Sequence, residues 1–273
     1  MRLFHYITIG LLITVGILEA LGRTIERPAY REYKEPLISD ESFSNLESYD
    51  ESIAAITMLI HGECCPRDLK KALTYCLQCL QDFEEDKDLQ EGVDPDKHAL
   101  NVLSAYLYIE IGDIKSAKSI LDREKHKGAD ILVLEGDVAI QEGRFDEARK
   151  KYERAIAEDS SNLQAALRLS IFSPRELTAS PREKRFTGDS LWLSAMRKNS
   201  IKWRKRVEEF SVDKPNRSLI FYPAAIAAAK MGVPSAMLFL HKVYMSGCGF
   251  IKKDVDRAEY WLWNAEFLSK DSH

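Results

Sequence analysis

The 273-residue sequence has little of what marks fibrous, low-complexity or strongly charged chains. Thirteen Gly and nine Pro are too few for a collagen-like or low-complexity chain. Lys and Arg total 39 and Asp and Glu total 43, so the net charge of −4 creates no global field that would recruit nucleic acid. The 45% hydrophobic content is sufficient for a core and predicts an ordinary globular chain.

Sequence motifs for catalysis are also missing. The chain has no Gly-rich phosphate loop, no paired-His zinc motif and no dinucleotide fingerprint. Gly188-Asp189-Ser190-Leu191 spells the nucleophile block of a family of serine esterases, but no Asp-x-x-His block follows it. The six His are scattered along the chain. We therefore expect a protein without catalytic residues, metal ligands or cofactors.

One long apolar run is present, at the amino terminus. Residues 3–18 follow Arg2, and only His5 interrupts them. The apolar core, residues 7–18, has the length of a signal-peptide core, and the small residues Ala20 and Gly22 predict cleavage before Arg23. The alternative is an uncleaved membrane anchor through residues 3–22, since about 20 residues can cross a bilayer. Both interpretations place the rest of the chain outside the cytoplasm, periplasmic or secreted, where nucleic acid is not an expected partner.

Five cysteines raise the question of disulfides, because exported chains meet oxidising conditions. Five is an odd number, so at least one thiol stays unpaired within the chain. A zinc site is an alternative, since His61 and Glu63 lie close to several of the thiols. Cys76 and Cys79 lie three residues apart, as on one face of a helix. This spacing favours thiols that pack in the core over a disulfide or a zinc site. The pairing itself stays open for Cys64, Cys65, Cys76, Cys79 and Cys248.

An internal repeat organises the middle of the chain. Gly112 and Gly143 lie 31 residues apart, and so do Ala117 and Ala148. Residues 129–162 form a 34-residue unit with predicted helices over residues 131–142 and 145–158. This unit resembles the tetratricopeptide repeat (TPR) at Leu132, Gly136, Ala139, Gly143, Phe145, Ala148, Tyr152 and Ala155. The preceding hairpin offers Ala105, Tyr108, Gly112, Ala117 and Leu121 at corresponding places.

A second resemblance lies at the carboxyl-terminal end. Residues 236–266 have the order and spacing of a Sel1-like repeat, in which Asp254 is expected to cap the second helix. The residues that carry the resemblance are Leu240, Tyr244, Gly247, Gly249, Lys253, Asp254, Arg257, Ala258, Trp261, Leu262 and Ala265. Residues 68–72 align with residues 254–258, so the first hairpin is interpreted as a degenerate copy that places Cys79 where Ala265 stands.

These repeats predict an all-α fold, a right-handed α-solenoid of stacked helical hairpins of TPR and Sel1-like type. Small residues at the helix crossings are expected to let paired helices approach closely. The expected parts are a signal peptide or anchor (1–22), a flexible leader (23–49), a degenerate Sel1-like hairpin (50–96), TPR hairpins (98–172), a basic helical connector (173–212) and a Sel1-like repeat region (213–270).

Two segments have strong local charge. Residues 82–96 carry eight acidic residues and one Lys, and residues 175–206 carry ten basic residues against three acidic ones. Within the basic segment a helix from about Ser190 is expected to bury an apolar stripe formed by Leu193, Met196, Trp203, Val207 and Phe210. The other face forms a predicted basic patch, either simply hydrated or in contact with an anionic surface, which consists of Arg197, Lys198, Arg204, Lys205 and Arg206.

The TPR resemblance implies a partner-binding groove lined by the first helix of each hairpin. The positions that it implies are Val102, Tyr106, Ile109, Glu110, Asp130, Val133, Asp137, Ile140 and Gln141. The alternative is that neighbouring hairpins cover several of these positions. We expect a non-enzymatic extracytoplasmic scaffold that binds a protein or peptide during assembly of an envelope, surface-polymer or secretion complex. The alternatives are an exported Sel1-like hydrolase or cell-wall-active enzyme, and a secreted effector that binds a host protein.

Overall fold

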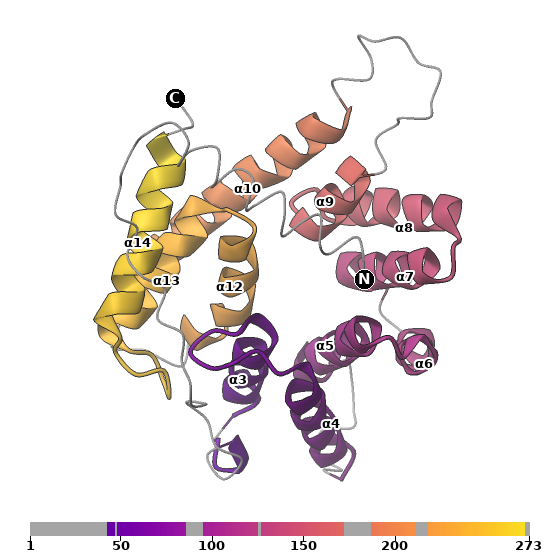
Figure 1. The fold of residues 1–273 in the computed structure, drawn as a ribbon, viewed down its shortest axis with the longest axis horizontal. Helices are drawn as coiled ribbons and strands as arrows, with labels where there is room; N and C mark the ends of the chain where they lie inside the picture. Colours follow the sequence, from indigo (N-terminus) through magenta and orange to yellow (C-terminus); the bar gives the residue numbers. More distant parts are fainter. Residues whose placement is uncertain are drawn as a thin grey trace.

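The structure, a computed structural model, describes residues 43–46, 48–85, 95–124, 127–171, 187–210 and 218–270. These residues form eleven helices and no strand, so the all-α prediction is confirmed (Figure 1). The helices are α3 (Tyr49–His61), α4 (Leu69–Glu85), α5 (Pro95–Ile111), α6 (Ile114–Arg123), α7 (Ala129–Gln141), α8 (Phe145–Glu158), α9 (Leu163–Ile171), α10 (Thr187–Glu209), α12 (Tyr222–Lys230), α13 (Pro234–Ser246) and α14 (Val255–Lys270).

Polar side chains begin many of these helices, because the first backbone N–H groups of a helix have no partner within it. The Asp113 carboxylate accepts from the Ser116 N–H at 3.1 Å at the start of α6, and Asn162 accepts from the Ala165 N–H at 2.9 Å at the start of α9. Gly112 and Gly143 provide the positive φ angles, 89° and 76°, of the turns after α5 and α7. Caps and turns of this kind connect successive antiparallel helices into hairpins.

The central hairpin, α7 and α8, matches the predicted 34-residue unit closely. Gly136 is buried, and a Cβ atom at this position would lie only 2.4 Å from Cε1 of Tyr152. The glycine therefore allows the Tyr152 ring to pack directly against the α7 backbone. Ala148 at the same crossing is fully buried, as are Ala105 and Ala117 between α5 and α6.

The last hairpin, α13 and α14, crosses through small residues as well. Ala258 and Ala265 are buried on α14, with Trp261 between them. The Asp254 carboxylate accepts from the Arg257 N–H at 3.1 Å and begins α14. Gly247 ends α13 with a φ of 77°, and a Cβ atom there would lie 3.2 Å from the Ile251 carbonyl oxygen, so the tight loop requires glycine; Gly249 in the same loop also has a positive φ.

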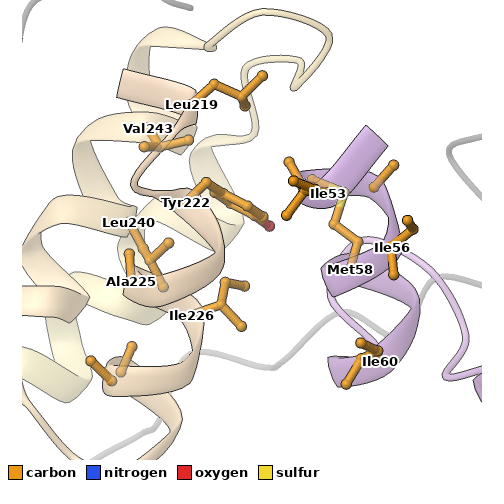
Figure 2. Close-up of a cluster of buried hydrophobic side chains, with 14 of the residues drawn as sticks. Ile53, Ile56, Met58, Ile60, Leu219, Tyr222, Ala225, Ile226, Leu240 and Val243 are labelled. Atoms are coloured by element: carbon orange, nitrogen blue, oxygen red, sulfur yellow. The ribbon is translucent and has the colours of Figure 1, made fainter. Parts of the chain in front are cut away.

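The first and last parts of the chain pack against each other. Helix α3 lies beside α12, and its apolar side chains face those of α12 (Figures 1 and 2). Ile53, Ile56 and Met58 on α3 belong to the same buried cluster as Tyr222 and Ile226 on α12. The stack of hairpins therefore turns back on itself, and its first hairpin gains a second apolar neighbour.

Several predictions concern residues at the ends of the described segments or outside them. The predicted signal or anchor (1–22) and most of the leader and acidic segment lie outside the described residues. Phe43, which belongs to the predicted flexible leader, is buried and stacks on Tyr75 with ring centroids 3.7 Å apart. The packed part of the chain thus begins before the leader was expected to end. Among the described helices, none is long and apolar enough to span a membrane.

Candidate partner-binding surface

The candidate surface is the inner face formed by α5, α7 and α9, the first helices of successive hairpins. Helix α7 contacts α5 on one side and α9 on the other. The face carries the predicted groove positions on α5 and α7, and their exposure differs widely. Asp130 and Gln141 are exposed, whereas Val102, Tyr106, Glu110, Asp137 and Ile140 are half-buried.

Two predicted groove residues are not accessible on this face. Ile109 and Val133 are 8% and 4% exposed, respectively. Ile109 packs in the cluster between α5, α6 and α7, and Val133 packs with Tyr152 and Ala165 from the following helices. Ile109 and Val133 therefore do not line an open groove, because neighbouring helices cover their side chains.

Asp137 is held by its own hairpin and by α9. Its carboxylate accepts hydrogen bonds from the Tyr152 hydroxyl at 2.8 Å and from Arg168 on α9, whose Nη2 atom lies 2.6 Å from Oδ2. Burial would lower the pKa of Arg168, but the Asp137 carboxylate outweighs this effect and raises it. Arg168 therefore stays charged and fastens α9 to α7. The sequence signal that would have identified Arg168 is its spacing of 31 residues from Asp137, which equals the spacing of Gly112 from Gly143.

A second ion pair joins the first hairpin to α5. Nη2 of Arg67, in the loop before α4, lies 3.2 Å from Oε2 of Glu110. Burial raises the pKa of the Glu110 carboxyl, and burial together with the nearby Glu110 charge raises the pKa of Tyr106 to about 12. The five residues Arg67, Tyr106, Glu110, Asp137 and Arg168 are called the inner-face cluster below.

The inner-face cluster contains two cations, two carboxyl groups and one phenol, so its charges balance. It offers hydrogen-bond donors and acceptors beside the half-buried apolar side chains of Val102 and Ile140. Mixed polar and apolar groups on adjacent helices can recognise a peptide through side-chain hydrogen bonds and apolar contact.

The predicted basic patch lies on α10. Arg197, Lys198, Arg204 and Lys205 are exposed. Arg206 differs, because its guanidinium stacks 4.0 Å from the ring centroid of Phe221 and donates to Glu209 at 2.9 Å. The expected burial of Leu193 is wrong: its side chain is 55% exposed, and Ala195 and Asn199 take the buried positions together with Trp203.

A buried polar centre that the sequence did not predict connects the first hairpin to the last. The Glu63 carboxylate is fully buried and accepts from Arg257, from the Tyr244 hydroxyl at 3.3 Å and from the Trp261 indole at 3.3 Å. Lys230 on α12 lies 3.5 Å from its other oxygen. Glu63, Lys230, Tyr244, Arg257 and Trp261 form what we call the Glu63 centre.

The five cysteines are free thiols, and all are buried. Burial raises the pKa of Cys64 and Cys76 to about 12 and that of Cys65 and Cys248 to about 11. In the described parts of the chain, no three His, Cys, Asp or Glu side chains are grouped in a way that could hold a metal ion. Glu63 is ion-paired with Arg257 and Lys230, and His61 is half-buried.

Comparison with known families identifies one repeat. The family model of the tetratricopeptide repeat matches residues 129–162, which are α7, α8 and the turns that flank them. No curated protein and no solved structure is significantly similar to the chain. The match identifies residues 129–162 as a tetratricopeptide repeat within an all-α arrangement of helical hairpins, which supports a repeat protein of TPR type.

Proposed function

We propose that this TPR-type protein is a non-enzymatic scaffold that binds a protein or peptide through the inner face of α5, α7 and α9. Repeats of this family generally bind protein partners. The observation that carries the proposal is the inner-face cluster, which places two ion pairs and Tyr106 beside Val102 and Ile140 on adjacent helices. The partner that fits is a segment with apolar side chains for these two aliphatic residues and polar groups for the cluster.

The finer role that we propose is extracytoplasmic, in assembly of an envelope, surface-polymer or secretion complex. Two features support it. The sequence begins with an apolar run of signal-peptide type, and the carboxyl-terminal hairpin has the Sel1-like pattern from Leu240 to Ala265. Mass spectrometry of the amino terminus of the protein from its native cell tests export: a mature chain that begins at Arg23 supports it, and a retained Met1 in a cytosolic fraction contradicts it.

Retention of partners from cell extracts tests the inner face. We expect Tyr106→Ala combined with Ile140→Ala to lose a specifically retained protein that the wild type captures. The matched control is Phe145→Ala combined with Val255→Ala, which removes an exposed aromatic and an exposed aliphatic side chain elsewhere. Equal retention by both double variants, with unchanged melting temperatures, would exclude this face as the binding surface.

A further inference from the structure

The outer face of α10 has an unusual combination of charge and apolar exposure. The helix presents one side to α9 and α13, with Ala195, Asn199 and Trp203 buried there. Trp203 packs against Phe239 of α13 with ring centroids 5.4 Å apart. The other side is exposed along its length and carries Leu191, Leu193, Arg197, Lys198, Ile201, Lys202, Arg204 and Lys205.

Helical geometry shows how wide this outer face is. With about 100° of rotation per residue, the eight side chains spread over roughly 180° of the helix circumference. Leu193 and Leu191 lie near opposite edges of this arc, and Ile201 lies between them. Basic side chains occupy the spaces between the apolar ones, so neither type forms a separate stripe.

The outer face carries a net positive charge within the described structure, although Glu208 and Glu209 are exposed on the same side at the carboxyl-terminal end of α10. No acidic residue occurs from Leu191 to Val207, although six basic residues do. Arg197, Lys202 and Arg204 make no ion pair with any described residue, and Lys205 lies 3.8 Å from Glu209. A net positive field close to the surface attracts an external anion.

The apolar side chains on the same face are unusually exposed. Ile201 is 68% exposed, which is the highest value among the large hydrophobic residues of the described chain. Ile201 follows Arg197 by four residues, and Arg197 follows Leu193 by four, so the three side chains line one ridge. A ridge of this kind presents apolar groups and a guanidinium to the same external surface.

We propose that the outer face of α10 docks on an anionic lipid bilayer, with the helix axis parallel to the membrane plane. Apolar side chains of such a helix enter the boundary between head groups and acyl chains, while Lys and Arg extend to the phosphates. The width of the face favours lipid over a partner helix. A helix–helix seam covers a stripe about 100° wide, whereas a bilayer surface can contact the whole half-circumference.

This inference rests on the proposed function only for the compartment, since export would bring the chain close to a membrane. Its test is separate, because vesicle binding does not depend on where the cell places the protein. It is also independent of the inner face, which lies on α5, α7 and α9.

Binding of the full-length chain to vesicles tests the proposal. We expect stronger partition to phosphatidylglycerol-containing vesicles than to pure phosphatidylcholine, with an affinity that falls as salt rises. Replacing three cations, Arg197→Gln, Arg204→Gln and Lys205→Gln, is expected to lower the anionic partition coefficient roughly a hundredfold, from about 1 kcal/mol per basic side chain. The matched control changes the same net charge at exposed sites elsewhere, Lys150→Gln, Arg154→Gln and Lys252→Gln. An equal loss in both triple variants would overturn the proposal.

A local probe separates α10 from the apolar amino-terminal run, which could itself enter a vesicle. All five native thiols are buried, so Ile201→Cys introduces an exposed thiol that a polarity-sensitive dye labels selectively. We expect a blue shift of this dye with anionic vesicles and none with neutral ones, and no shift for the same dye at Ala157→Cys on α8. Failure of the Ile201 dye to respond to anionic vesicles would refute docking through α10. A response to polyglutamate alone would instead indicate an acidic protein as the partner.

Discussion

Gly136 shows at the scale of one residue how the repeat depends on close approach. The Tyr152 ring fills the space that a side chain at Gly136 would need, with Cε1 only 2.4 Å from an ideal Cβ. The sequence pattern predicted this glycine, because the resemblance places a small residue at the crossing of the two helices. The partner that makes the glycine necessary became known only from the packing of α7 on α8.

We expect Gly136→Ala to destabilise the protein by about 2 to 3 kcal/mol, because overpacking outweighs the better helix propensity of alanine. Urea unfolding measures the change. Gly112→Ala is the control: no atom lies within 4 Å of its Cβ position, so only the positive φ of 89° opposes the substitution, and a cost of about 1 kcal/mol is expected. A smaller cost at Gly136 than at Gly112 would contradict the packing explanation.

His61 provides a pH-dependent term in stability. Burial lowers the pKa of His61 to about 4, and the nearby Lys230 charge acts in the same direction against the smaller opposing effect of Glu63. The unfolded chain takes up a proton near pH 6.5, whereas the folded chain does so only near pH 4. The stability that the neutral imidazole contributes is therefore present above pH 6.5 and is lost as the pH falls toward 4.

We expect the free energy of unfolding to decrease by about 2 kcal/mol more for the wild type than for His61→Gln between pH 7 and pH 5. Urea titrations at the two pH values measure this difference. The contributions of the carboxyl groups to the pH dependence cancel, because both proteins contain the same carboxyl groups. If the free energy of unfolding changed equally with pH in both proteins, His61 would contribute nothing to its pH dependence.

At the scale of helices, the beginnings of α4 and α14 are equivalent. The Asp68 carboxylate accepts from the Lys71 N–H at 2.9 Å, and the Asp254 carboxylate accepts from the Arg257 N–H at 3.1 Å. This equivalence follows from the alignment of residues 68–72 with residues 254–258 in the sequence. It identifies the first hairpin as structurally similar to the last at its second helix.

Asp68→Ala and Asp254→Ala are each expected to destabilise the protein by about 1 kcal/mol, since each leaves a helix N–H without its cap. Thermal unfolding compares both with Asp122→Ala, which changes an exposed residue of α6 and is expected to be nearly neutral. A cost confined to one of the two capping positions would argue against their equivalence.

Helix α10 shows where periodicity misleads. The apolar spacing predicted that Leu193 would face the core, but the structure buries Ala195 and Asn199 instead. Asn199 donates to the Ala195 carbonyl at 3.2 Å and also bonds the Ser161 carbonyl of the turn before α9. A polar residue whose hydrogen bonds are satisfied by neighbouring backbone can be buried at little cost, and hydrophobic pattern cannot identify it.

At the scale of the whole molecule, the Glu63 centre makes the two ends interdependent. Glu63 and Arg257 are 194 residues apart in sequence, and both are buried in contact with each other. An ordinary solenoid stabilises each repeat only through its neighbours. Here the contact of α3 with α12, together with this ion pair, adds a long-range link between the first and last hairpins.

We expect Glu63→Gln to destabilise the protein by about 3 kcal/mol, because it leaves the buried Arg257 guanidinium without its nearest counter-charge. Hydrogen exchange should accelerate in α3 and α14 together, although only α3 lies next to the substituted residue in the sequence. Glu259→Gln on the exposed side of α14 is the control. Faster exchange limited to the first hairpin would show that the two ends do not stabilise each other.

The sequence by itself determined the helical hairpins of this protein, because small residues, turn glycines and capping carboxylates act over a few residues and leave a local pattern. Gly143, Ala148 and Asp254 are examples. Their spacing was sufficient to place α7, α8 and the start of α14.

Only the tertiary structure decided which side chains of the inner face stay accessible and how the chain closes. Val133 became buried because Tyr152 of its own hairpin and Ala165 of α9 pack on it. Asp137 became an ion-pair partner because Arg168 reaches it from α9. Glu63 meets Arg257 through the path of the whole stack, since the accumulated rotation of successive hairpins brings distant ends together. Such contacts depend on the sum of many packing angles, and no local pattern in the sequence records that sum.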